Sequence, residues 1–131
     1  MVYGNVGVYG NAMVYGNALV YGNAKVYDDA QVHGYAWVCD NAQVCDNAQV
    51  YDDAQVFGHA SVYDSAQVFG HAKIYGIAWV YGIAQVYDDA QVFGHAKVFG
   101  HAKIYDEAQV HGNARVCNNS VVCDDTEVLG N

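Results

Sequence analysis

The sequence contains no proline, only five lysine and arginine residues, and no long apolar run. The lack of proline, together with a hydrophobic content of 53%, excludes the polar, proline-rich composition of a disordered chain. No segment approaches the roughly 20 consecutive apolar residues that a membrane span needs, and the opening MVYGNVGVYG lacks the basic and apolar regions of a signal peptide. We therefore expect a folded, cytoplasmic protein that does not bind a membrane.

The scarcity of positive charge also limits the choice of partners. Fourteen aspartate and glutamate residues outnumber the five basic residues and give a net charge of −9. Such a chain repels the phosphates of nucleic acids, so we predict no direct nucleic-acid binding and, for any protein partner, a basic surface. The composition does not change along the sequence, which predicts a single domain over residues 1–131.

A six-residue repeat occupies the whole chain. From Val2 to Val128 every sixth residue is valine, except Ile74 and Ile104, which makes twenty-two repeats without an insertion. Four positions after each of these residues stands a small residue, which is alanine throughout the range 12–114. The unit reads V-Y-G-N-A-x, and we number its positions slot one to slot six.

A period of six excludes a helix, whose apolar face recurs every 3.6 residues, and it lacks the irregular turn signals of a hairpin sheet. A β-solenoid remains. We expect slot one to point inward, slots six and two to flank it outward on a short strand, and slots three and four to turn a corner. Slot five should point inward at that corner. Slots three and four hold Gly-Asn, Asp-Asp, Asp-Asn or Gly-His, which are residues that favour turns.

The V-x-[GD]-[NDH]-A-x pattern resembles the hexapeptide-repeat superfamily, and the resemblance covers the entire chain. It implies an all-β fold, a single-stranded left-handed parallel β-helix with a triangular cross-section and three repeats in each coil. Twenty-two repeats would then make about seven coils, a prism roughly 35 Å long at the strand spacing of about 4.8 Å.

With three repeats per coil, aromatic residues at slot two stack in outward ladders, which stabilise the coils or, as exposed apolar surface, mediate lateral association. The predicted aromatic faces comprise Tyr27, Tyr51, Tyr63, Tyr81, Tyr87, Phe93, Phe99 and Tyr105, together with Trp37 and Trp79. The cysteines Cys39, Cys45, Cys117 and Cys123 also occupy slot two. No two of them are stacked neighbours, so we expect free thiols.

Eight of the fourteen carboxylates fall on one corner, which we call the acidic ridge. Its members are Asp52, Asp53, Asp88, Asp89, Asp106, Glu107, Asp124 and Asp125. The ridge can be a solvated corner that keeps the protein soluble, a site for a divalent cation, or a mimic of a nucleic-acid backbone. The pattern assigns no metal ligand set to it.

Three histidines are the only weak catalytic candidates. Members of the hexapeptide superfamily include acyltransferases, and the resemblance implies a histidine as general base and coenzyme A or an acyl carrier protein as the acyl donor. His71, His95 and His101 could fill that role, but no loop interrupts the repeat to shape a cleft. We therefore predict no catalytic residue and no cofactor.

The repeat starts at residue 2 and runs to Asn131 without a polar cap, so we expect open β edges at both ends. The leading prediction is a non-catalytic structural or interaction module that self-associates through its uncapped ends or its aromatic faces and can also bind a protein partner. It would form a homo-oligomer or an end-to-end assembly. The alternatives are a coenzyme A-dependent acyltransferase and an acidic inhibitor that mimics nucleic acid towards a nucleic-acid-binding protein.

Overall fold

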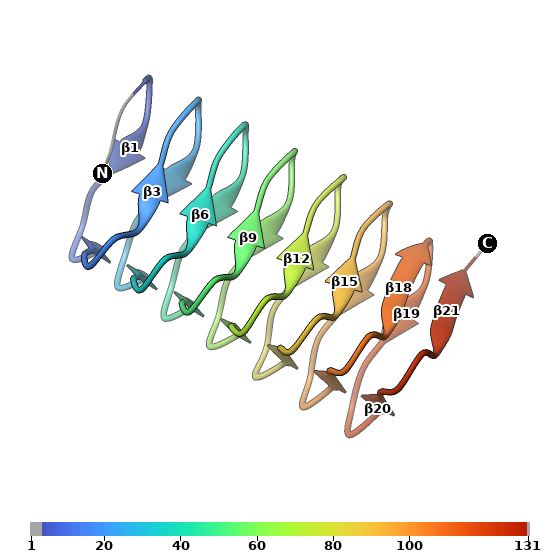
Figure 1. Ribbon diagram of the computed structural model, residues 1–131. Coiled ribbons are helices and arrows are strands. Elements are labelled where there is room, and N and C mark those ends of the chain that lie inside the picture. The colour runs from blue at the N-terminus through green and yellow to red at the C-terminus, as the bar shows by residue number, and fades with distance from the viewer. Residues whose placement is uncertain (1–3, 131) are drawn as a thin grey trace.

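The protein is a parallel β-solenoid with seven strands in each of three sheets (Figure 1). The computed structural model describes residues 4–130, so the first repeat residue, Val2, and Asn131 lie outside the described residues. Within that range the chain contains strands and turns only, and no helix that could cross a membrane is found there. The predicted all-β fold with three repeats per coil is confirmed.

Most strands are two residues long and hold slots six and one of the repeat. The first sheet contains β1 (Gly7–Val8), β4 (Lys25–Val26), β7 (Gln43–Val44), β10 (Ser61–Val62), β13 (Trp79–Val80), β16 (Lys97–Val98) and β19 (Arg115–Val116). The second contains β2 (Met13–Val14), β5 (Gln31–Val32), β8 (Gln49–Val50), β11 (Gln67–Val68), β14 (Gln85–Val86), β17 (Lys103–Ile104) and β20 (Val121–Val122). The third contains β3 (Leu19–Val20), β6 (Trp37–Val38), β9 (Gln55–Val56), β12 (Lys73–Ile74), β15 (Gln91–Val92), β18 (Gln109–Gly112) and β21 (Glu127–Gly130).

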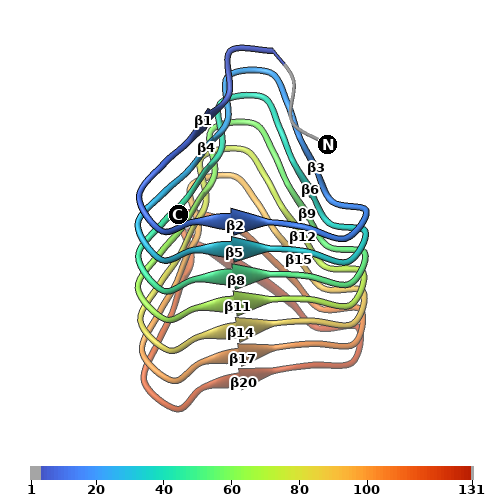
Figure 2. The same cartoon turned by 90° about the vertical axis from the view of Figure 1, so that its left-hand side faces the viewer.

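The coils enclose a triangular prism that winds with a left hand. In Figure 2, which faces the N-terminal end, the chain passes from β1 to β2 to β3 counterclockwise as it recedes from the viewer. Each strand pairs in parallel with the strand one coil away, and Val62, for example, is in register with Val80. Stacked side chains therefore come from equivalent slots of adjacent coils, three repeats apart in the sequence.

The core consists of the slot-one valines and the slot-five alanines. In the middle coils these side chains are fully buried, with Ile74 and Ile104 at two valine positions. No polar or charged residue of the described chain is buried. The inward positions predicted from the repeat are therefore confirmed, and folding depends on close packing of small apolar side chains.

Backbone hydrogen bonds run along the axis of the prism and join each coil to the next. The N–H groups of slots six, two and four donate to carbonyl oxygens of the following coil, as in Tyr63 to Val80 (3.0 Å) and Ser65 to Gly82 (2.9 Å). Because neighbouring coils supply these bonds, a coil cannot form its ladder alone.

Slot three requires a left-handed backbone. Each residue at this slot from Gly4 to Asp124 has a positive φ, between 57° and 88°. Only glycine reaches this region without strain, and aspartate and asparagine tolerate it better than other residues. This geometry explains why slot three holds only glycine, aspartate or asparagine up to Asp124.

Candidate functional site: the acidic ridge and the Trp79 groove

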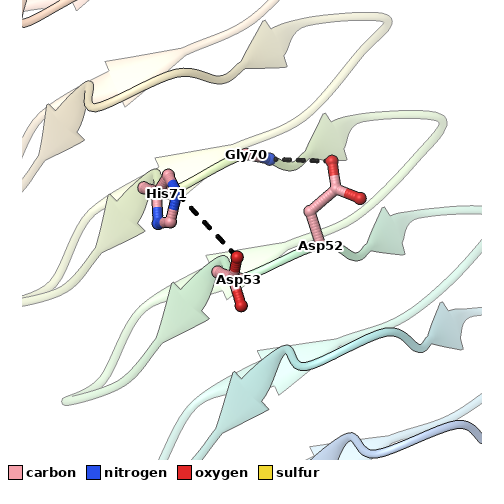
Figure 3. Close-up of polar contacts among 4 residues, drawn as sticks. All are labelled: Asp52, Asp53, Gly70 and His71. Atoms are coloured by element: carbon pink, nitrogen blue, oxygen red, sulfur yellow. Dashed lines mark hydrogen bonds and ion pairs between the residues drawn. The ribbon is translucent and has the colours of Figure 1, made fainter.

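The acidic ridge lies on the corner between the second and third sheets, at the lower right in Figure 2. Its members from Asp88 to Asp125 line a shallow trough together with His71. Asp53 lies one coil before His71, and its Oδ2 is 3.8 Å from Nε2 of His71, with both side chains exposed (Figure 3). The structure thus brings together the carboxylates that the coil period assigned to one corner.

The two carboxylates of each coil have different roles. At slot three, Asp52 accepts a hydrogen bond from the N–H of Gly70 one coil on (3.2 Å, Figure 3). Asp88 and Asp106 accept equivalent bonds from the N–H groups of Asp106 and Asp124 (3.3 and 3.1 Å). These three slot-three carboxylates therefore cap backbone donors, whereas the slot-four carboxylate of Asp53 extends to His71.

The same contact recurs on the other corners, and it can be tested at Asp64, which accepts from the N–H of Gly82 (3.1 Å) at a φ of 57°. Asp64→Ala should lower the free energy of unfolding by about 1–2 kcal/mol, because it removes the acceptor and leaves a Cβ in a left-handed backbone. Asp64→Gly should cost less, since the backbone strain disappears, and Asp64→Asn should stay near the parent protein. Urea titration measures the series, and an Asn variant as unstable as the Ala variant would contradict this role.

Crowding of the carboxylates changes the pKa of one ridge residue, Glu107. A hydrogen bond with Asp125, followed by the charge of the same carboxylate, raises the pKa of Glu107. The two groups are stacked neighbours at slot four. Negative charges on successive coils repel one another, and this repulsion adds to the hydrogen bond in favouring the protonated form of Glu107.

One group among residues 4–130 brings three metal-ligand atoms together. Single ligand atoms of Asp106, Cys123 and Asp124 lie within 4.8 Å of one another. Asp106 also accepts the N–H of Asp124, and the Cys123 thiol lies 3.9 Å from the Asp124 carboxylate. Internal contacts account for this cluster, and a divalent cation on the ridge stays a hypothesis.

The predicted aromatic ladders are stacked in face-to-face geometry. Neighbouring rings in the longest ladder have centroids 4.7–5.1 Å apart and planes within 8° of parallel. That ladder contains Tyr15, His33, Tyr51, Phe69, Tyr87 and Tyr105. A second ladder contains Phe57, Tyr75, Phe93 and His111, and a third contains Tyr63, Tyr81 and Phe99. Tyr27 stacks on Tyr9. Most of these rings are half-buried, so they stabilise the stack of coils.

All four cysteines are free thiols, as predicted. Cys45 follows Tyr27 in its ladder, and a hydrogen bond between the two side chains raises the pKa of Tyr27. Burial raises the pKa of the Cys39 and Cys45 thiols, which disfavours the reactive thiolate. Burial also raises the pKa of Tyr63 to about 12. These groups are packing elements of the ladders.

The three candidate histidines lie on three different corners and do not converge. His71 lies on the acidic ridge, whereas His95 and His101 line separate grooves beside the first and second sheets. All three side chains are exposed. His71 lies beside the carboxylate of Asp53. His95 and His101 lie beside slot-six side chains of their own grooves, so the three histidines do not form one site.

A groove of about 360 Å³ runs along the first sheet, and we call it the Trp79 groove. It is lined by Ile77, Trp79, His95, Lys97, Asn113 and Arg115. The Nζ of Lys97 lies 4.7 Å from the centroid of the Trp79 ring, a cation–π contact. Slot-four residues form one wall and slot-six residues the other.

A groove of the same pattern lies beside the second sheet. Slot four again supplies isoleucine, histidine and asparagine (Ile83, His101 and Asn119), and Lys103 occupies the slot that Lys97 holds in the Trp79 groove. Gln85 and Val121 replace the tryptophan and the arginine. The two grooves share one wall chemistry, but only the Trp79 groove combines an aromatic ring with two adjacent cations.

Comparison with known proteins supports the fold. A family model described as the YdcK β-solenoid repeat matches residues 8–22, 20–34 and 108–124. These segments are similar to that repeat and include strands near both ends of the described solenoid. No curated protein and no solved structure matches the chain. A β-solenoid repeat is thus supported, while membership of the hexapeptide-repeat superfamily stays a prediction.

Sequence reasoning missed the Trp79 groove. The signal was present, because Trp79, Lys97 and Arg115 follow one another at slot six of successive coils. Equivalent slots of successive coils are in register, so this spacing alone places the three side chains next to one another. His33 and His111 replace Tyr or Phe rings in two ladders, and the signal is again their slot-two position between stacked aromatic residues.

Proposed function

We propose that the chain is a non-catalytic β-solenoid module of the hexapeptide-repeat type that associates with copies of itself through its lateral surfaces. The observation that supports this most directly is the exposure of large apolar side chains on the middle coils. Trp37 is 41% exposed, Ile77 46%, Trp79 38% and Ile83 54%. Apolar side chains grouped beside unpaired charges mark surfaces that bind protein.

The form of the molecule is consistent with such a role. In residues 4–130 the repeat is never interrupted by an inserted loop, and the side chains of slots four and six form straight ladders on rigid coils. Such a surface loses little backbone entropy when it binds, because the paired strands already hold the backbone in register.

The oligomeric state tests the proposal. Sedimentation velocity over roughly 1–500 µM, the range in which a moderate complex dissociates, should show a weight-average sedimentation coefficient that rises with concentration. Electron microscopy should show assemblies at the upper end of the range. A single monomeric species at every concentration would exclude self-association.

A further inference from the structure

The lysine and arginine side chains among residues 4–130 are not paired with carboxylates. Fourteen carboxylates outnumber five cations, yet no lysine or arginine of the described chain forms an ion pair; the ion pairs found there involve His71 and His111. Lys97 and Arg115 are neighbours on the first sheet, away from the acidic ridge. Two unpaired cations on adjacent coils of an acidic protein indicate a surface that binds an anionic partner.

The Trp79 groove offers both charge and apolar surface. Trp79, Lys97 and Arg115 are paired in register on β13, β16 and β19, so they stand one coil apart. Lys97 already covers the Trp79 ring, and the exposed Ile77 extends the apolar wall. A partner whose carboxylates pair with Lys97 and Arg115 would also bury the apolar surface of Trp79 and Ile77. Burial of that surface adds a hydrophobic contribution to the binding free energy.

The acidic ridge of another copy matches this groove in spacing. Its slot-four carboxylates Asp89, Glu107 and Asp125 follow one another coil by coil, as the backbone bonds from Asp89 to Asp106 and from Glu107 to Asp124 show (2.9 and 3.0 Å). Both ladders therefore repeat at the strand spacing of about 4.8 Å. These side chains are exposed, and their carboxylates cap no backbone donor.

We propose that the Trp79 groove of one copy binds the acidic ridge of a second copy, with Lys97 and Arg115 facing the slot-four carboxylates. This interface rests on the proposed self-association and names its site. The groove lies beside the first sheet and the ridge lies on the corner between the second and third sheets, so one copy can use both at once. Such a heterologous contact adds copies side by side and is not limited to a dimer.

Charge reversal in the groove tests the interface. Lys97→Glu with Arg115→Glu should weaken self-association at least about tenfold, because two attractive pairs become repulsive. The matched control is Lys25→Glu with Lys103→Glu, which changes the net charge equally at cations outside the Trp79 groove and outside the ridge trough and should leave association near that of the parent. In a Trp37→Phe background Trp79 is the sole tryptophan, and its fluorescence should shift to shorter wavelength on association.

Mixing complementary variants identifies the ridge as the occupant. A variant with Asp89→Lys, Glu107→Lys and Asp125→Lys should not self-associate, but it should bind the groove variant when the two are mixed. If the groove variant associates as tightly as the parent, the inference is overturned while self-association stands. If neither variant associates and the mixture also fails, the ridge is not the occupant. A monomeric parent protein would overturn the proposed function itself.

Discussion

Deletion of Gln67 alone should destroy the fold of the following coils, whereas deletion of residues 61–78, one whole coil, should leave a folded, shorter solenoid. Without Gln67, each later residue moves back by one slot, so Phe69 would take an inward valine position and Lys73 an inward alanine position. Burial of unpaired lysines and loss of the valine core should cost more than about 5 kcal/mol. Circular dichroism and urea unfolding measure both variants.

The whole-coil deletion keeps every slot and every face. It joins Ala60 to Trp79, and β13 takes the place of β10, with which it pairs in register. We expect a cooperative transition with a smaller m-value, in proportion to the shorter chain. Removal of residues 61–66 is the intermediate control, because the core slots stay in phase while all later ladders move to another face. Equal stability of the one-residue and whole-coil deletions would contradict the slot assignment.

Val80→Asp should severely destabilise the protein, because Val80 is fully buried and the described core contains no polar group that could pair with a carboxylate. An unpaired buried charge costs several kcal/mol, so we expect a loss of at least about 4 kcal/mol at pH 7. Val80→Ile is the matched control, because isoleucine already occupies this slot at Ile74 and Ile104. It adds one methylene to the core and should cost about 1–3 kcal/mol, less than the aspartate.

The pH dependence of Val80→Asp follows from the same burial. Removal from water raises the pKa of the introduced carboxyl above its value of about 3.9 in the unfolded chain. The neutral form is compatible with the core below that unfolded value, and its advantage is lost as the pH rises through the folded pKa. The variant should therefore lie closest to the parent at about pH 4 and below, measured by urea midpoints across pH. A destabilisation that does not change with pH would point to altered shape as the cause.

The repeat predicts most of the fold because each slot has one backbone requirement. Slot one must be β-branched and apolar, slot five must be small enough for the corner, and slot three must accept a positive φ, so the sequence pattern reports these positions directly. The coil period also predicts which residues share the acidic ridge. These are properties of backbone geometry, which repeats without change along the chain.

Other features depend on side-chain direction, which the period does not determine. The slot-three carboxylate of Asp52 turns along the axis to accept the N–H of Gly70, whereas the slot-four carboxylate of Asp53 extends to His71. The sequence places both on one ridge and does not distinguish them. In the same way, the pattern does not show that the Lys97 side chain lies over the Trp79 ring.

Some slots of the repeat determine the fold, and others can be substituted without affecting it. Slots four and six supply only a backbone N–H to the coil-to-coil bonds, and in this chain slot four holds residues as different as Asn11, Ile77 and Glu107, while slot six holds Met13, Trp79 and Lys97. The location of each such side chain on the surface is defined by its face and its coil. Substitutions at these slots can therefore change the charge and polarity of one face without changing the fold, and two faces of one molecule can differ in surface chemistry independently.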